Sequence, residues 1–267
     1  MTDLSGRRVV ITGADGTFGR LLATQFKARG ARVAGLDLRG DDVIRCDLTD
    51  PQAVKDAVAQ AVELLGGLDL LINNAGVGGP APAELAPGAE ARQQIEVNLL
   101  AAWSVTAAAL PALESSRGRV IFVSSRMAFL ALPLAAAYGV SKRAVAAYAD
   151  ALRLEVGTHV GVTVVYPSMV PSPIHDATAE AGLSLQGVSR YEPVEGVIAA
   201  IMRAATARKP LRDVATTRRG WFEIAIARHL PGLAARMVRR TIATRIAAGD
   251  LDNAPLAAGM RRRHGRS

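Results

Sequence analysis

Three glycines near the start of the chain have the spacing of a phosphate-binding turn. Gly13, Gly16 and Gly19 follow the apolar run of residues 9–12, and a helical pattern begins near residue 18. At a junction between a strand and a helix, backbone N–H groups point at a bound phosphate and the helix dipole favours the anion. Tight turns also use glycine for its backbone freedom alone, so the position at this junction is what predicts dinucleotide binding.

An acidic residue at the end of the next apolar run bears on which dinucleotide binds. Asp37 lies 24 residues after Gly13. A carboxylate near this spacing accepts hydrogen bonds from the adenosine ribose hydroxyls and repels a 2′-phosphate, which favours NAD over NADP. Arg39 is a signal in the opposite direction, because its guanidinium could reach a 2′-phosphate. In the alternative interpretation both residues belong to a solvated loop; we predict NAD, with NADP as the less favoured cofactor.

Short apolar runs alternate with longer stretches of helical spacing over most of the chain. Strands separated by such helices form βαβ units, in which helices cover both faces of a parallel sheet. Burial on both faces also explains why the runs are continuously apolar. We predict an α/β fold, with a Rossmann-type doubly wound parallel sheet over residues 1–217 and a helical C-terminal extension over residues 218–267 that is not an independent domain. The predicted strands are 9–12, 32–36, 43–46, 68–72, 119–124 and 160–166, and the predicted helices are 18–29, 51–65, 88–114 and 136–156.

The excess positive charge of the chain is confined to the extension. The net charge is +8; residues 218–267 contain 11 Lys and Arg against 3 Asp and Glu, whereas residues 1–217 contain 21 of each sign. A basic end can bind an anionic membrane or nucleic acid, or it can be a solvated face. Aromatic residues make up 4% of the chain, so we expect no nucleic-acid binding through base stacking. The apolar residues between the arginines suit a segment that covers the substrate pocket or makes peripheral contact with a membrane.

Several other kinds of site are not expected. Cys46 is the only cysteine, which excludes an intramolecular disulfide and a cysteine-rich metal site. No spacing of His, Asp and Glu predicts a metal ion, and no serine lies in a nucleophile elbow. The N-terminus lacks the pattern of a signal peptide and the longest apolar runs are too short to span a membrane, so we expect a cytoplasmic protein.

Four short motifs follow one another along the chain. They are Thr12-Gly13, Asn73-Asn74-Ala75-Gly76, Ser124-Ser125 and Tyr138-Gly139-Val140-Ser141-Lys142. In this order and spacing they resemble the ordinary (non-extended) branch of the short-chain dehydrogenase/reductase family, over about residues 5–175. The resemblance implies a Rossmann-type fold and nicotinamide-dependent interconversion of alcohols and carbonyl compounds. It also suggests a homodimer or homotetramer formed through the alanine-rich helices near residues 99–112 and 136–151.

The resemblance assigns roles to individual residues. Tyr138 is the acid/base, and its partner Lys142 also binds the ribose. Ser125 binds the carbonyl oxygen, and Asn98 supports a water-linked proton relay. The residues that the resemblance and the glycine turn together place around the cofactor are Thr12, Gly13, Asp15, Gly16, Thr17, Phe18, Gly19, Asp37, Asp47, Leu48, Asn74, Ala75, Gly76, Tyr138, Lys142, Pro167, Ser168, Val170 and Ser172.

A tyrosine needs a nearby positive charge to act as a base at neutral pH, because its ordinary pKa is near 10. Lys142 follows Tyr138 by four residues, so both side chains project from one face of a helix. A unit charge at about 4 Å is worth roughly 4 kcal/mol at an effective dielectric constant of about 20. We therefore predict that Lys142 brings the pKa of Tyr138 close to neutrality, while Ser125 donates to the developing oxyanion.

Thr17 departs from the ordinary family pattern, in which a glycine occupies its position. The spacing of Gly13, Gly16 and Gly19 is closer to the extended branch, which contains sugar-nucleotide epimerases and dehydratases that retain NAD. A non-catalytic dinucleotide-binding interaction module is a third interpretation, and the intact serine, tyrosine and lysine set argues against it.

The preferred interpretation is an oxidoreductase that transfers a hydride between NAD(H) and a secondary alcohol or ketone. The pocket segments 127–134 and 172–190 are apolar to mixed in character, which favours a hydrophobic substrate. Arg126 could contact an anionic substrate, although a structural role is the more common one for such an arginine.

Overall fold

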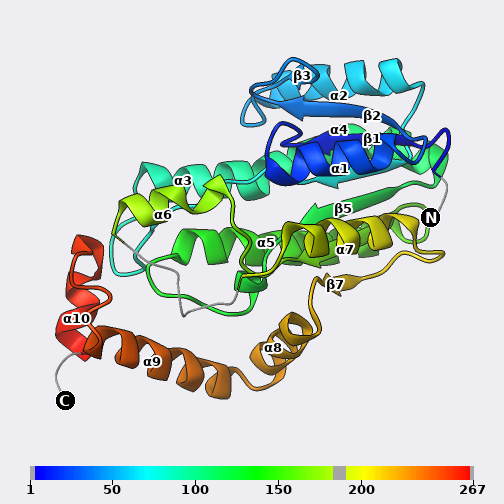
Figure 1. Cartoon of the computed structure of the whole chain (residues 1–267). Coiled ribbons are helices and arrows are strands. Elements are labelled where there is room, and N and C mark those ends of the chain that lie inside the picture. Colours follow the sequence, from blue (N-terminus) through cyan, green and yellow to red (C-terminus); the bar gives the residue numbers. More distant parts are fainter. Residues whose placement is uncertain (1–3, 183–190, 265–267) are drawn as a thin grey trace.

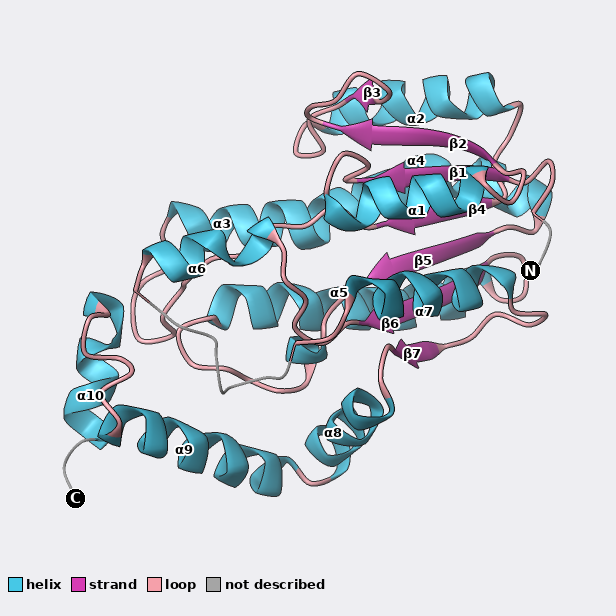
Figure 2. Ribbon diagram, viewed as in Figure 1, coloured by secondary structure: helices cyan, strands magenta, loops and turns pink. Residues whose placement is uncertain are grey.

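Seven strands form one parallel sheet in the order β3-β2-β1-β4-β5-β6-β7 (Figure 1, Figure 2). The computed structural model describes residues 4–182 and 191–264. Because β1 pairs with both β2 and β4, the strand order reverses between β1 and β4. The predicted Rossmann-type α/β fold is confirmed. The strands are β1 (Arg8–Thr12), β2 (Arg32–Asp37), β3 (Ile44–Arg45), β4 (Leu70–Asn73), β5 (Arg119–Val123), β6 (Gly161–Tyr166) and β7 (Asp213–Ala215).

Helices cover both faces of the sheet, as the doubly wound arrangement requires (Figure 2). One face is covered by α2 (Pro51–Leu65), α4 (Ala101–Ser116) and α5 (Ala136–Val156). The other face is covered by α1 (Thr17–Lys27) and α7 (Val194–Thr206).

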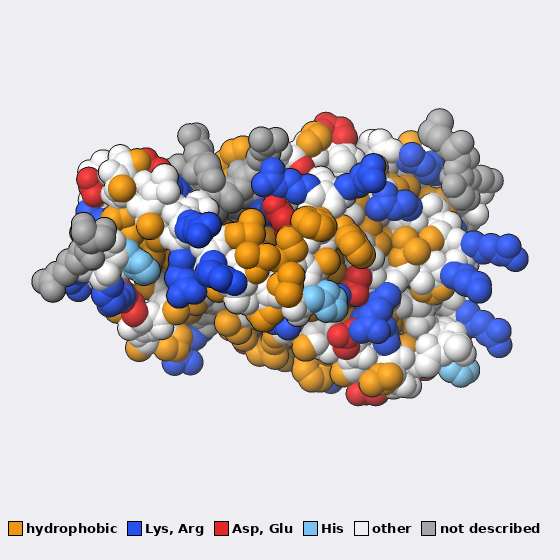
Figure 3. All heavy atoms as spheres, turned by 90° about the horizontal axis from the view of Figure 1, so that it is seen from below, with side chains coloured by type: hydrophobic (Ala, Val, Ile, Leu, Met, Phe, Trp, Pro, Cys, Tyr) orange, Lys and Arg blue, Asp and Glu red, His pale blue; other side chains and the backbone are white. Residues whose placement is uncertain are grey.

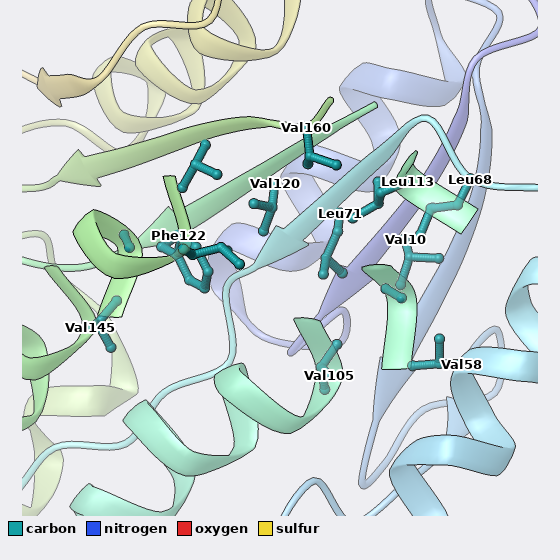
Figure 4. Packing of buried hydrophobic residues seen from close by; sticks show 14 of the residues in the cluster. Val10, Val58, Leu68, Leu71, Val105, Leu113, Val120, Phe122, Val145 and Val160 are labelled. Carbon is teal, nitrogen blue, oxygen red and sulfur yellow. The ribbon is translucent and has the colours of Figure 1, made fainter. Parts of the chain in front are cut away.

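The strand side chains pack alternately into two hydrophobic cores. Val10 belongs to the core beneath α2, α4 and α5, whereas Val9 and Ile11 belong to the core beneath α1 and α7. All three side chains are fully buried. Figure 4 shows the first core, in which Val10 lies among residues such as Leu71. Two-sided burial is therefore the reason for the continuously apolar strand sequences.

Helix α2 begins where its sequence predicts. The Asp50 side chain accepts hydrogen bonds from the backbone N–H groups of Gln52 and Ala53, and Pro51 occupies the first helical position. Such a cap stabilises a helix by about 1 kcal/mol. The helix ends at Leu65 and is capped by Gly66, whose φ of 72° is a left-handed conformation that favours glycine.

The predicted helix over residues 88–114 is a continuous helical segment with a π-turn inside it. It consists of α3 (Ala89–Ile95), the π-turn η1 (Glu96–Leu100) and α4. By length and composition alone, residues 89–116 could cross a membrane. Val105, Ala109 and Leu113 are instead fully or almost fully buried in the core against the sheet, which is the position of a core helix.

The C-terminal extension comprises α8 (Arg218–His229), α9 (Pro231–Ala247), the turn η4 (Pro255–Ala257) and α10 (Ala258–His264). Ile224 of α8 belongs to the core beneath α2, α4 and α5. Helix α9 leads away along the outside of the molecule (Figure 1), and Ala234 is its only buried residue, all of α9 being described. The last turns form a small hydrophobic cluster with Leu134 and Ala181, which come from the main domain.

Candidate active site

A cavity of about 630 Å³ lies at the carboxyl ends of the strands. Its wall contains residues that directly follow β1, β2, β4, β5 and β6. Ligands of doubly wound sheets bind at this edge, next to the point where the strand order reverses. The position of the cavity therefore matches a dinucleotide site.

Most of the predicted site residues line this cavity. Thr12, Gly19 and Asn98 do not, and each of them lies directly behind residues that do. The predicted residues on the wall are Gly13, Asp15, Gly16, Thr17, Phe18, Asp37, Asp47, Leu48, Asn74, Ala75, Gly76, Ser125, Tyr138, Lys142, Pro167, Ser168, Val170 and Ser172.

The glycine turn after β1 requires glycine at two positions. Gly13 has a φ of +64°, and a Cβ there would lie 2.8 Å from the Cα of Ala75. A Cβ on Gly19 would collide with the Gly13 carbonyl oxygen. Thr17, by contrast, is exposed at the first position of α1, so its side chain does not disturb the turn. The N-terminus of α1 is thereby open toward the cavity, and phosphate binding uses such an end of a helix.

Thr12 and Asn74 fix the turn to the end of β4. The Thr12 hydroxyl oxygen accepts hydrogen bonds from the backbone N–H groups of Asn74, at 3.0 Å, and Ala75, at 3.1 Å. The Asn74 side chain donates to the carbonyl oxygens of Thr12 and Gly13, both at 3.0 Å. Thr12 thus shapes the cavity from behind its wall.

Asp37 stands at the end of β2 and faces the glycine turn. Its carboxylate accepts a hydrogen bond from the backbone N–H of Asp15 at 2.9 Å and a longer one from that of Arg39 at 3.4 Å. Both Asp37 and Arg39 line the cavity. The carboxylate is held by backbone groups, and the guanidinium of Arg39 is on the exposed loop beside it.

Ser125, Tyr138 and Lys142 meet on the far wall of the cavity. Ser125 follows β5 and lies close enough to the phenol of Tyr138 on α5 to lower its pKa. The Lys142 ammonium nitrogen lies 5.7 Å from the centre of the Tyr138 ring and donates to the Val123 carbonyl oxygen at 3.1 Å. The Ser124 hydroxyl donates to the Lys142 carbonyl oxygen at 2.9 Å, which ties α5 to the end of β5. The three predicted catalytic side chains are therefore brought together.

Burial, rather than the charge of Lys142, governs the phenol of Tyr138. Burial raises the pKa of Tyr138 to about 12, and the nearby Ser125 hydroxyl offsets part of this rise. Burial also lowers the pKa of Lys142 to about 8. The prediction that Lys142 brings the pKa of Tyr138 near neutrality is thus wrong for the protein without a ligand. Its reasoning counted the lysine charge and omitted the cost of removing both groups from water.

Asn98 lies in the π-turn η1 and connects three segments behind the wall. Its side-chain oxygen accepts from the Val77 N–H at 2.8 Å, and its amide donates to the Val77 carbonyl and the Ser141 hydroxyl, both at 3.0 Å. A Cβ on Gly76 would lie 3.2 Å from both Asn98 Oδ1 and Lys142 Nζ. Asn98 is therefore close to Lys142, and the small size of Gly76 permits this approach.

Glu192 is a structural residue of the site that no sequence pattern pointed to. It is 5% exposed and accepts hydrogen bonds from the Ser168 backbone N–H and the Thr216 hydroxyl. Burial raises the pKa of Glu192, and these hydrogen bonds and the nearby Arg126 oppose the rise. Glu192 thereby joins the segment after β6 to the segment after β7.

Arg126 connects the catalytic serine loop to the extension. It forms an ion pair with Glu223 of α8, and both side chains are less than one-fifth exposed. This supports the structural role favoured for Arg126. No residue of the extension within the described range 218–264 lines the cavity. The extension was expected to cover the pocket, but none of its described residues forms part of the cavity wall.

The cavity wall beyond the catalytic set is mainly apolar. The apolar residues of this wall come from the loops after β4, β5 and β6 and from the helical segments next to those loops. Only some of these segments were predicted from the sequence. The apolar residues include Val77, Val97, Met127, Leu132, Met169, Ile174 and Ala177.

The fold and the site together define a dinucleotide-binding α/β protein with a serine, tyrosine and lysine set. A family model described as short chain dehydrogenase matches residues 7–182. The chain belongs to the short-chain dehydrogenase/reductase family, and its motifs are those of the ordinary branch. The predicted family membership is confirmed.

Relatives show how far the likeness extends. 11-beta-hydroxysteroid dehydrogenase A from Sesamum indicum is 30% identical over 188 residues, which cover 64% of this chain and 54% of that protein. The chain thus spans about half the length of this plant relative. 1-deoxy-11-beta-hydroxypentalenate dehydrogenase from Streptomyces exfoliatus is 35% identical over 218 residues, which cover 73% of this chain and 79% of that protein. The ligand-free structure of Thermoplasma acidophilum aldohexose dehydrogenase is similar with a TM-score of 0.71 at 25% identity, covering 78% of this chain and 92% of that one.

Proposed function

We propose that the protein is an NAD(H)-dependent oxidoreductase that interconverts a secondary alcohol and a ketone. The observation that carries this proposal is that Ser125, Tyr138 and Lys142, which lies one helical turn after Tyr138, line the same cavity as the glycine turn. A dinucleotide fits the turn, because its glycines leave the N-terminus of α1 open.

Each side chain of the set has a step that its position supports. The nicotinamide cofactor, when bound, donates or accepts the hydride. Ser125 donates a hydrogen bond to the substrate oxygen, and Tyr138 gives that oxygen a proton in reduction or takes one in oxidation. Lys142 is held by the Val123 carbonyl, so its ammonium stabilises the phenolate from a fixed position.

The activity is tested by NADH formation with secondary alcohols and NADH consumption with ketones. Tyr138→Phe should lower the turnover by about 100-fold or more, since it removes the proton-transferring hydroxyl. The dissociation constant for NADH should stay within about twofold, because the ring still fills its place. Unchanged turnover in this variant would contradict the assignment of Tyr138.

The choice of NAD rests on the position of Asp37. Its carboxylate lies beside the glycine turn, where a ribose hydroxyl donates and a 2′-phosphate is repelled. In a thermal-shift titration, NAD or NADH at about 100 times its dissociation constant should raise the midpoint by about 5–10 °C. NADP and NADPH should give a comparable shift only in Asp37→Ala. A larger shift with NADP(H) in the wild type would show that Arg39 determines the preference.

The apolar wall favours a hydrophobic substrate. Two relatives are named for hydroxylated compounds, a hydroxysteroid and a hydroxypentalenate, whereas the structural relative is named for an aldohexose. The wall near Leu132, Ile174 and Ala177 agrees with the first group. The two substrate classes are compared by measuring kcat/KM for a panel of steroid alcohols and sugars. A higher kcat/KM for an aldohexose than for the steroid alcohols would overturn this substrate assignment.

We also propose that the outer face of α4 and α5 forms a homodimer interface. Trp103 is 51% exposed and Val140 58% exposed, and Trp103 stacks on Tyr148 of α5 at 4.5 Å between ring centres. Proteins that stay monomeric rarely expose large contiguous apolar patches. Sedimentation equilibrium should show a dimer that Trp103→Glu converts to a monomer; a wild-type monomer would contradict the proposal.

A further inference from the structure

Large apolar side chains are exposed on the outer side of α8 and α9. Trp221 and Phe222 are each 62% exposed, Leu230 is 55% exposed, Leu233 is 40% exposed and Met237 is 53% exposed. Figure 3 faces this side of the molecule and shows hydrophobic side chains gathered there with arginines around them. These five residues, together with Arg236, Arg239 and Arg240, are called the α8–α9 surface below.

The helical spacing places apolar and basic residues on the same outer side. On α9, Leu233, Met237 and Arg240 follow one another at intervals of four and three residues, which is one helix face. On α8, Phe222 lies away from Ile224, which is the residue that enters the core. Trp221 lies one turn before Ile224 and is nevertheless 62% exposed. The two helices thus present an amphipathic surface whose polar part is basic.

The arginines of this surface differ from those that hold the extension together. Arg219 pairs with Glu223 and Arg228 with Asp213. Arg236, Arg239 and Arg240 are exposed and have no ion pair with a carboxylate in the described part of the chain. Their charge is available to a partner.

We propose that the α8–α9 surface binds an anionic lipid bilayer. A second copy of the chain would bring like charges together, because this surface is positive and residues 218–267 hold the whole excess charge of the protein. An anionic bilayer instead attracts the arginines and accepts the apolar side chains at its boundary between headgroups and acyl chains. Tryptophan is enriched at this boundary, and Trp221 is 62% exposed.

Flotation of the full-length protein with vesicles tests the charge part of the proposal. The protein should float with vesicles of phosphatidylcholine and phosphatidylglycerol, remain below vesicles of phosphatidylcholine alone, and be released by added salt. Arg236→Gln/Arg240→Gln should weaken binding about 25-fold, since each arginine near an anionic surface contributes about fivefold. The control Lys55→Gln/Arg92→Gln removes two exposed charges from other helices and should change binding less than about twofold.

Fluorescence of Trp221 tests the insertion part. The chain has two tryptophans, so Trp103→Phe leaves Trp221 as the single reporter. Its emission should shift to shorter wavelength with anionic vesicles and be quenched by brominated acyl chains. Trp221→Ala/Phe222→Ala in the otherwise wild-type chain should weaken vesicle binding by roughly tenfold or more, with an unchanged thermal shift by NADH.

Three outcomes would overturn the proposal. One is failure of the folded, NADH-binding protein to float with anionic vesicles. Another is flotation without a change in Trp221 emission, which would leave the apolar residues unused. The third is a self-association that Trp221→Ala/Phe222→Ala abolishes while vesicles do not bind, which would make this face an interface between copies. None of these readouts depends on turnover, so failure here leaves the proposed activity standing.

Discussion

Replacement of Lys142 by methionine should stabilise the folded protein without a ligand, and by an amount that depends on pH. Lys142 is 3% exposed, and burial lowers its pKa from 10.5 to about 8. Below pH 8 the ammonium is charged in both the folded and the unfolded chain, and its burial costs about 3 kcal/mol of the free energy of unfolding. Between pH 8 and 10.5 the folded state has released this proton while the unfolded state still holds it. The cost therefore disappears as the pH rises through this range.

The magnitude follows from the two pKa values of Lys142. Between pH 7 and pH 9.5 its contribution to the free energy of unfolding rises by about 2 kcal/mol. Methionine has no charge to bury, so this pH dependence is absent from Lys142→Met. The variant also loses the hydrogen bond to the Val123 carbonyl, which costs about 1 kcal/mol at either pH and cancels when the two pH values are compared.

Urea unfolding of wild type and Lys142→Met at pH 7 and pH 9.5 measures the effect. The stability advantage of the variant should be smaller by about 2 kcal/mol at pH 9.5. Lys55→Met replaces an exposed lysine and should show the same difference from wild type at both pH values. An advantage of Lys142→Met that does not change with pH would refute the reasoning, because it would mean that the ammonium is not desolvated in the folded protein.

Two further changes test the turn and the connection to α8. Gly19→Ala should destabilise the protein by about 2 kcal/mol or more and abolish the NADH thermal shift, because the new methyl group meets the Gly13 carbonyl. Gly232→Ala is its control, since nothing lies within 4 Å of a Cβ there, and an equal loss in both variants would show that the Gly19 contact is unimportant. Glu223→Gln should cost about 2 kcal/mol in urea unfolding by weakening the largely buried pair with Arg126. Arg219→Gln breaks a more exposed pair with the same glutamate and should cost no more than about 1 kcal/mol. A larger loss of stability in Arg219→Gln than in Glu223→Gln would contradict the structural role of Arg126.

The sheet and most of the cavity wall could be predicted because local signals specify them. The glycine turn, the cap at Asp50 and the apolar strands each depend on neighbouring residues, and so does the pairing of Tyr138 with Lys142 on one helix. The edge strand β7 and helix α7 were missed. The strand is only three residues long and includes Asp213, so its sequence carries little strand signal.

What remained unpredicted depends on contacts between distant segments. Glu192 acquires its role only when the ends of β6 and β7 meet. The π-turn that contains Asn98 leaves the apolar pattern of residues 88–114 nearly unchanged, so the periodicity could not reveal it. The pKa of Tyr138 was misjudged for a related reason: its burial is a property of the assembled cavity and not of the helix that carries it.

The order of the strands along the chain, with β1, β2 and β4 ahead of β5 and β6, sets the order in which the parts of the site are synthesised. The proposed adenosine and phosphate contacts, from Gly13 through Asp37 to Asn74, all belong to the first third of the chain. The groups that act on the substrate, Ser125 and Tyr138, follow only after a further fifty residues or so, and Glu192 is later still. On the ribosome, the nucleotide-binding half can pair its strands while the catalytic half is still absent. The part of the chain proposed to hold the adenosine and the phosphates therefore leaves the ribosome before the part that acts on the substrate.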